Sequence, residues 1–293
     1  MNAAAVALGF GLVSAAFISI AAVGATLQFG ITNYMNFALG DYMTIGAYSA
    51  WVLTTKLHLD FWLSTALSFF VGGAVALLIS RIVLAPFVRR KTPILYMLIV
   101  TLGVGLVITN TILLLDGTGP EQYPEAIVAQ SALHIGPFVA TPNQLVTIGI
   151  AAVVMLAIHM MLTRTALGKS MRAMSDDADL ARVSGIDAVR ITDWVWFLSG
   201  GLAGVAGVLL ALDVGSFTPA FGELFLFVVF AAVVVGGAGH PYGAMLGALI
   251  TGLVTALSVI FLNSAYKNDV AFLILLAALV LRPRGLIASK RAV

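Results

Sequence analysis

The stretch GKSMRAMSDDADLARVSGID, residues 168–187, is a charged segment in an otherwise strongly apolar chain. It contains three positive and four negative side chains. The apolar runs on either side, 143–163 and 193–213, are each long enough to cross a lipid bilayer as a helix. This arrangement predicts an element at the membrane surface between two spans. The alternative is a solvated loop that only satisfies the charge topology.

The residues of this segment follow a helical period. Small or flexible apolar side chains recur in steps of three and four and mark one helix face, formed by Met171, Met174, Ala178 and Ala181. Asp176, with Asp179 three residues later, predicts a helix start, and Gly185 predicts a left-handed stop. We therefore expect a short amphipathic helix or helix-turn-helix that presents its small-residue face outward.

The composition places the chain among the polytopic membrane proteins. Hydrophobic residues make up 61% of it and charged residues 10%, whereas soluble domains carry roughly a quarter charged residues. The net charge of +2 does not indicate nucleic-acid binding, because the basic residues are not gathered into a patch. Cysteine is absent, which excludes disulfides and thiolate ligands, and the four histidines lie too far apart in sequence to predict a metal site.

Hydropathy predicts an all-α fold with about nine transmembrane helices. The expected spans lie near residues 5–27, 37–55, 61–84, 93–115, 143–163, 193–213, 222–235, 240–262 and 268–282. The second and seventh are short and begin near glycine and polar residues. No basic residue precedes Lys56, so the first run lacks the basic region of a signal peptide and is expected to be a retained span.

The distribution of lysine and arginine predicts the orientation. If the connection 85–92 is cytoplasmic, thirteen basic residues fall on the cytoplasmic side and only Lys56 and Lys267 on the other. The thirteen are Arg81, Arg89, Arg90, Lys91, Arg164, Lys169, Arg172, Arg182, Arg190, Arg282, Arg284, Lys290 and Arg291. The amino terminus is then expected outside and the carboxyl terminus inside. The loop 116–142, with four prolines and no lysine or arginine, becomes an external cap without a fold of its own, or a plain connector.

Two polar stretches interrupt the apolar pattern at corresponding places. Residues 30–41 and 213–223 each end in glycine followed by a carboxylate, and each then enters a span. The predicted topology runs these two spans in opposite directions. This predicts an inverted repeat, with a first repeat at about 1–116, a connector span at 143–163 and a second repeat at about 193–285. Irregular backbone within a membrane must be buried or line a cavity, so the breaks are expected along the translocation path.

Eight residues at these breaks are candidates for that path: Asn33, Asn36, Gly40, Asp41, Ser216, Thr218, Gly222 and Glu223. The preferred alternative for the two carboxylates is that they cap helix starts. The asparagines could instead bond backbone groups that the breaks set free. No span centre carries an obvious charged residue, which argues against ion coupling within this chain and for an external energy source.

The charged segment also carries a resemblance to a known family. Its pattern of Gly168, Arg172, Ala173, Asp177, Ala181, Gly185 and Ile186 resembles the cytoplasmic coupling loop of the permeases of bacterial branched-chain amino-acid ABC importers. NYMNFALGDYMTIGAY (33–48), VVVGGAGHPYGAMLGALI (233–250) and the ending LRPRGLI (281–287) are similar to stretches of the same family. The resemblance implies that loop 164–192 couples to an ATPase through Gly168, Arg172, Ala173, Asp177, Ala178, Ala181 and Gly185.

The resemblance further implies a multi-pass permease of the bacterial inner membrane that works by alternating access. Its expected partners are a second permease (a homologue or a second copy), two ATP-binding subunits and an external solute-binding protein. The chain itself would have no catalytic residue, metal or cofactor, and ATP and magnesium would be used by the ATPase. The alternative is a stand-alone channel or facilitator for a small neutral solute such as urea, which would not need the charged segment.

Overall fold

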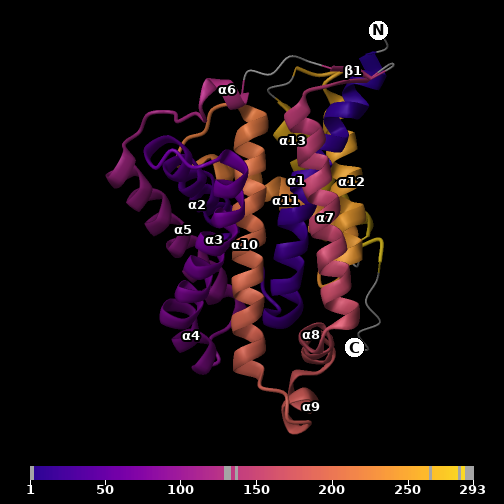
Figure 1. Cartoon of the computed structure of the whole chain (residues 1–293). Coiled ribbons are helices and arrows are strands. Elements are labelled where there is room, and N and C mark those ends of the chain that lie inside the picture. The colour runs from indigo at the N-terminus through magenta and orange to yellow at the C-terminus, as the bar shows by residue number, and fades with distance from the viewer. Residues whose placement is uncertain (1–2, 129–132, 136–137, 264–265, 283–284, 288–293) are drawn as a thin grey trace.

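In the computed structural model the chain is a bundle of helices with one short pair of strands (Figure 1). The structure describes residues 3–128, 133–135, 138–263, 266–282 and 285–287. Three of the thirteen basic residues predicted on the cytoplasmic side, Arg284, Lys290 and Arg291, lie outside these residues, as does part of the LRPRGLI ending.

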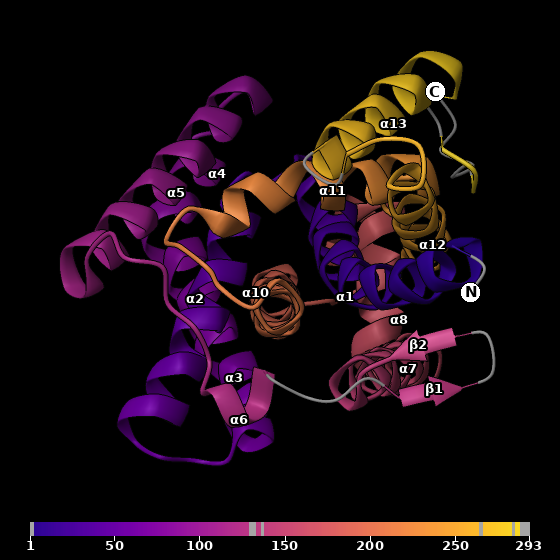
Figure 2. The ribbon, with the colours of Figure 1, turned by 90° about the horizontal axis from the view of Figure 1, so that it is seen from above.

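The helix α10 (Ala188–Val214) forms the axis of the bundle. It packs against α1 (Ala3–Thr32), α2 (Leu39–Trp51) and α3 (Phe61–Ile79), and Figure 2 shows it end-on between the two groups of helices. A side chain at Gly46 of α2 would collide with the backbone of α10 at Gly204, and a Cβ at Gly204 would lie 2.9 Å from the carbonyl oxygen of Ser68 in α3. Small residues allow this close approach between helices in lipid.

The first group of helices continues from α2 to α5. A π-helical turn, η1 (Val52–Lys56), ends α2, and a second one, η2 (Ser80–Leu84), joins α3 to α4 (Ala85–Arg89). α5 (Ile94–Asp116) then runs along the outside of the bundle, where many of its apolar side chains are exposed. The other group contains α11 (Phe221–Gly236), α12 (Pro241–Ser258) and α13 (Lys267–Leu281).

The segment between the two groups begins with a structured loop. It contains the single turn α6 (Glu125–Val128) and an antiparallel pair of β1 (Leu133–Ile135) and β2 (Phe138–Ala140). The cap expected there thus contains one helical turn and one short strand pair. α7 (Pro142–Arg164) follows, and α8 (Ala166–Asp176) and α9 (Ala178–Val183) extend from the end of the bundle (Figure 1).

A helix lies at each of the nine predicted spans, but they differ in length. Among the described residues, six helices are long and apolar enough to cross a membrane: Val6–Thr32, Phe61–Arg89, Ile94–Asp116, Pro142–Arg164, Ala188–Val214 and Pro241–Ser258. α2, α11 and α13 are shorter. The chain is therefore a multi-pass, predominantly helical membrane protein.

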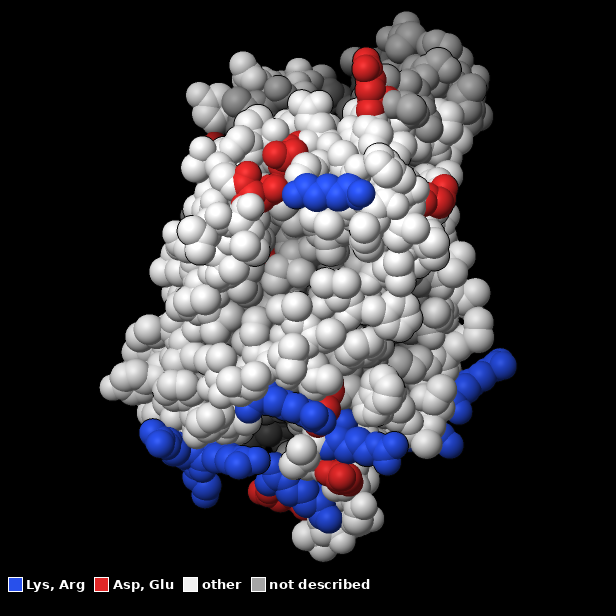
Figure 3. All heavy atoms as spheres, turned by 60° about the vertical axis from the view of Figure 1, so that its left-hand side comes forward, with Lys and Arg blue, Asp and Glu red and all other residues white. Residues whose placement is uncertain are grey.

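Charged side chains lie mainly at the two ends of the bundle. On the face drawn in Figure 3, lysine and arginine gather at the end that carries α9, and the broad belt between the ends holds few charged side chains. At one end Lys56 pairs with Asp116, and at the other Arg81 pairs with Asp193. An apolar belt between charged ends is the pattern expected of a protein embedded in lipid.

Candidate functional site

The two broken segments meet inside the bundle. Residues 33–38 separate α1 from α2, and residues 215–220 separate α10 from α11. A Cβ built on Gly40 would lie 2.5 Å from the carbonyl oxygen of Gly222, so the first turns of α2 and α11 are in backbone contact. The sequence predicted both breaks but gave no reason to expect that they touch.

Thr109 of α5 joins the two carboxylates that follow these glycines. Its Oγ1 lies 2.8 Å from Asp41 Oδ1 and 3.1 Å from Glu223 Oε1, and Asp41 is only 1% exposed. The hydroxyl carries one hydrogen and can donate to one carboxylate at a time. Both hydrogen bonds therefore form together only when the other carboxyl carries a proton and donates it to Thr109 Oγ1.

This arrangement corrects one expectation, that the two carboxylates cap the helix starts. The residues at the N-cap positions of α2 and α11 are Ala38 and Ala220, and neither start has a side-chain cap. Asp41 and Glu223 lie in the first turns, where a carboxylate still meets the positive end of the helix dipole. The hydrogen bonds that their side chains accept come from Thr109 of α5. The prediction that no span centre carries a charged residue is not contradicted, because Asp41, although only 1% exposed, lies in the first turn of α2.

A second polar cluster lies beside the first break and centres on Gln28, which was not among the predicted site residues. Gln28 Oε1 accepts hydrogen bonds from Asn36 Nδ2 at 3.3 Å and from Ser199 Oγ at 3.1 Å. Asn36 Oδ1 in turn accepts from the backbone N–H of Ala38 at 3.1 Å. Asn36 thus stabilises the broken backbone, which is the alternative role considered for it. A lone glutamine in an apolar helix was the available signal.

The remaining path candidates lie away from this centre. Asn33, with φ 58°, is exposed just beyond the end of α1. Ser216 and Thr218 are exposed in the second break, next to Phe217. Phe217 and Glu121 of the structured loop exchange backbone hydrogen bonds of 2.9 and 3.0 Å. Burial and the nearby Asp116 raise the pKa of the Glu121 carboxyl.

The charged segment folds as two short helices, α8 and α9. Asp177 forms the cap between them and accepts hydrogen bonds from the N–H groups of Asp179 and Leu180 at 3.0 and 2.9 Å. The helix start thus lies one residue later than the sequence suggested. Gly185, at φ +86°, has the left-handed conformation that was predicted.

The α8 helix is held closely against the end of α7. A Cβ at Gly168 would lie 2.5 Å from Leu162 Cα and would collide with the carbonyl oxygen of Met161. Thr165 caps α8 by accepting a hydrogen bond from the Gly168 N–H at 3.0 Å. Along the same helix, Arg172 is exposed and Ala173 is partly buried. Any force on α8 is therefore transmitted to α7 through a tight backbone contact.

The face of the segment that was expected to point outward instead points into the chain. Met171, Met174 and Ala181 are 3%, 5% and 3% exposed, and Ala178 is partly buried. The exposed apolar side chains of α9 are Leu180 and Val183. The periodicity identified the apolar face correctly, but an apolar face next to a membrane domain packs against that domain.

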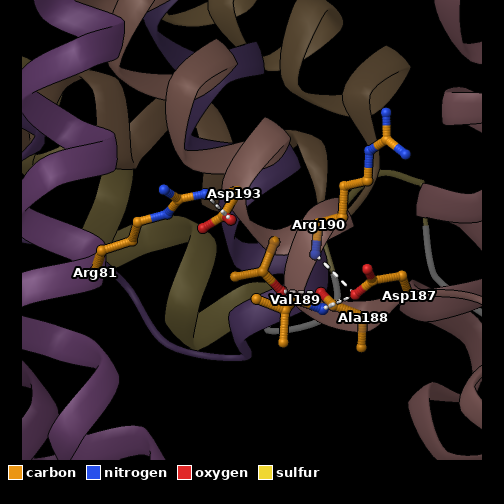
Figure 4. Close-up of polar contacts among 7 residues, drawn as sticks. Arg81, Asp187, Ala188, Val189, Arg190 and Asp193 are labelled. Atoms are coloured by element: carbon orange, nitrogen blue, oxygen red, sulfur yellow. Dashed lines mark hydrogen bonds and ion pairs between the residues drawn. The ribbon is translucent and has the colours of Figure 1, made fainter.

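Two acidic residues fix the start of α10 beside this segment (Figure 4). Asp187 caps the helix by accepting hydrogen bonds from the N–H groups of Val189 and Arg190, both at 3.1 Å. One turn later, Asp193 forms an ion pair of 2.6 Å with Arg81 of η2. This contact ties the central helix to the first group of helices at the end near α9.

The structure offers no metal site in the part of the chain that it describes, since no group of three or more His, Asp or Glu side chains is arranged to hold an ion. The arrangement provides a crossing of two short helices, α2 and α11, in the core and a pair of consecutive short helices, α8 and α9, at one end. Neither is a catalytic arrangement of a nucleophile and a base.

Comparisons with known proteins relate the chain to membrane transport permeases. Residues 7–279 match the family described as "Branched-chain amino acid transport system / permease component". The probable branched-chain amino acid transport permease protein LivH of Methanocaldococcus jannaschii is 31% identical over 90% of this chain and 86% of its own. LivH of Escherichia coli is 30% identical over 92% of this chain and 90% of its own.

A sugar permease and a solved structure are also similar. The ribose import permease protein RbsC of Escherichia coli is 30% identical over 89% of this chain and 81% of its own. The structure of PsaBC from Streptococcus pneumoniae in complex with Fab has a TM-score of 0.51 and covers 96% of this chain and 92% of that one, at 14% identity. That likeness concerns the fold. The sequence matches cover nearly the whole chain, and the chain belongs to the family of branched-chain amino acid transport permease components.

Proposed function

We propose that this chain is the permease subunit of an ATP-driven importer for branched-chain amino acids in a bacterial inner membrane. The observation that carries the proposal is the pair of short helices α8 and α9. This charged element lies at the basic end of the bundle and exposes Leu180 and Val183. Leu180 and Val183 are three residues apart on α9 and form one exposed apolar face, and such a face outside the membrane belt favours a protein contact. The substrate follows from the LivH relatives, which span most of the chain.

The proposed topology has nine membrane segments, with the amino terminus outside and α8–α9 in the cytoplasm. Six long helices cross the membrane, and α2, α11 and α13 complete the number as shorter segments. Repeats at about 1–116 and 193–285 lie on either side of the connector α7, and their corresponding breaks meet at Gly40 and Gly222. Short, broken helices at equivalent positions of two halves are typical of transporters with inverted repeats.

The proposed transport cycle couples an ATPase to the crossing of α2 and α11. The ATPase binds Leu180 and Val183, and movement of α8–α9 passes to α7 at Gly168 and to α10 at Asp187. α10 packs against α2 and α3 on one side and against α1 on the other, and α1 in turn packs against α11 and α12. A tilt of this axis therefore moves one group against the other. Packed interfaces have discrete arrangements, so such a tilt produces alternating access to the two sides.

The proposed complex contains a second permease, two ATP-binding subunits that use ATP and magnesium, and an external solute-binding protein. The structured loop at 117–141, tied to the second break through Glu121 and Phe217, is the proposed contact for the binding protein. The stand-alone channel for a neutral solute remains the alternative, but it leaves the exposed apolar residues of α9 without a role.

The test is uptake into proteoliposomes that contain the assembled complex and its binding protein. Labelled leucine, isoleucine and valine should accumulate only with enclosed ATP, and ribose and urea, tested in parallel, should not. A hydrolysis-deficient ATPase is the matched control and should abolish accumulation. Flux of urea through the purified chain without ATP would instead establish the channel, and uptake of ribose alone would assign the sugar specificity of the RbsC relative.

A further inference from the structure

A cavity of about 240 Å³ lies behind α8, between this helix, the end of α1 and the start of α12. It is separate from the crossing of α2 and α11, whose residues do not line it. The face of α8 that lines the cavity includes Met171, which is buried in this chain. The cavity therefore belongs to the element through which the ATPase is proposed to act.

The cavity carries both signs of charge. Arg172 and Asp176 line it from successive turns of α8, and neither side chain belongs to an ion pair among the described residues. The start of α12 at Pro241 also faces the cavity, and no side chain caps this helix. The free N–H groups and the dipole of a helix start favour an anion. Separate positions for an anion and a cation are thus available.

Two buried polar atoms at the cavity lack a hydrogen-bond partner in the described part of the chain. Thr26 lines the cavity and is 0% exposed, and its Oγ1 is unpaired. His240, at the cap position of α12, also lines the cavity and has an unpaired, buried Nδ1. Buried polar atoms in native proteins are nearly always paired. A polar ligand in the cavity would satisfy them.

The rest of the lining is largely apolar and matches a small hydrocarbon side chain. Leu27, Ile31, Leu162 and Met171 provide this wall. The volume corresponds to about eight water molecules at roughly 30 Å³ each, and valine and leucine contain a comparable number of non-hydrogen atoms. A site with an apolar wall and a few convergent polar groups is the usual form of a small-molecule site.

We propose that this cavity binds a zwitterionic α-amino acid with an apolar side chain. The α-carboxylate lies between Arg172 and the start of α12, the α-ammonium group faces Asp176, and the side chain contacts Leu27 and Ile31. The ligand's source rests on the proposed function: it is the transported product after its release on the side of α8. Occupancy holds α8 against α1 and α12, and it thereby slows transport when the product accumulates.

Binding is measured by equilibrium dialysis of labelled leucine against the intact permease–ATPase complex without the solute-binding protein. Leucinamide, which lacks the carboxylate, and 4-methylpentanoate, which lacks the ammonium group, should each bind at least about tenfold more weakly, because each loses a charge-assisted contact. Arg172→Gln and Asp176→Asn should weaken leucine binding to a similar extent. Arg190→Gln is the matched control, because Arg190 is exposed and does not line the cavity.

Ala238→Leu provides a second variant that keeps every charge and fills the cavity. In proteoliposomes, leucine on the side of α8 should slow wild-type uptake several-fold. For each variant, the uptake rate without this leucine is divided by the rate with it. The resulting ratio should be close to one for Ala238→Leu. Absence of leucine binding to the wild-type complex, or equal binding by Arg172→Gln and wild type, overturns the proposal. If ATP drives leucine uptake but the complex binds no leucine in dialysis, only the cavity site is overturned. If the complex binds leucine but does not transport it, the site is supported and the proposed function is overturned.

Discussion

Gly40 and Gly222 place the backbones of two helices from opposite halves of the chain in direct contact. A Cβ on Gly40 would lie 2.5 Å from the Gly222 carbonyl oxygen and 2.8 Å from its carbonyl carbon. Real Cβ atoms do not approach backbone atoms this closely, so any residue other than glycine must push α2 and α11 apart. The crossing is thus fixed by the absence of two side chains.

The first prediction is that Gly40→Ala destabilises the protein by about 1–3 kcal/mol, the usual cost of forcing extra volume into a packed interior. Gly103→Ala in α5 is the matched control, because no atom lies within 4 Å of a Cβ built there. That change should be neutral or stabilise by about 0.4–1 kcal/mol through the unfolded state. Thermal unfolding of both variants in detergent provides the measurement. Equal melting temperatures would show that the crossing can open without cost.

The second prediction concerns the hydroxyl that bridges the two carboxyl groups. Thr109→Val keeps the shape of the side chain and removes the bonds to Asp41 and Glu223, which leaves a buried carboxyl without this donor. The expected loss of stability is about 1–3 kcal/mol. Thr109→Ser, which keeps the hydroxyl, should recover most of it. A Val variant as stable as the Ser variant would mean that the hydroxyl does not stabilise the crossing.

The sequence was sufficient to locate the helices, because long apolar runs and glycine or proline breaks are local signals. All nine predicted spans contain a helix, and Gly185 has the predicted left-handed conformation. The pairing of the two breaks was not predictable, since no pattern in the sequence states which distant backbones touch. Thr109 gave no signal either, because a threonine in an apolar helix usually bonds its own backbone.

The errors at the candidate sites have a common physical origin. Asp41 was interpreted as a helix cap because local rules reward a carboxylate near a helix start, whereas tertiary contacts with α5 decide its partners here. Ala181 was expected on the exposed face of the segment, because it shares a helical period with other small or flexible apolar side chains. Packing against the bundle instead buries it and leaves Leu180 exposed. Periodicity identifies a face but does not state what covers that face.

The third prediction tests the proposed orientation, and the absence of native cysteine makes it direct. Thr118 is exposed in the loop after α5, and Ser184 is exposed at the end of α9. A cysteine at Thr118 should react with an impermeant maleimide in intact cells, whereas one at Ser184 should react only after permeabilisation. Labelling is read on gels with a membrane-permeant maleimide as the control for reactivity. The reverse pattern would invert the topology and place α8–α9 outside.

The fourth prediction separates the two faces of α9. Leu180 is 65% exposed and Ala181 is 3% exposed. Leu180→Asp should therefore leave the permease folded and lower the amount of ATPase that co-purifies with it, because a charge replaces an apolar contact. Leu57→Asp is the matched control at the opposite end of the bundle, where Leu57 is 61% exposed, and it should not affect the ATPase.

Ala181→Trp should act differently, because its new side chain must enter the packed contact between α9 and the bundle. We expect this variant to lower the melting temperature of the isolated permease, a result that Leu180→Asp should not produce. Co-purification and thermal unfolding of the same preparations distinguish the two effects. If Ala181→Trp instead leaves the permease stable and removes the ATPase, the small-residue face is the docking surface after all. Normal ATPase recovery with Leu180→Asp would remove Leu180 from that surface.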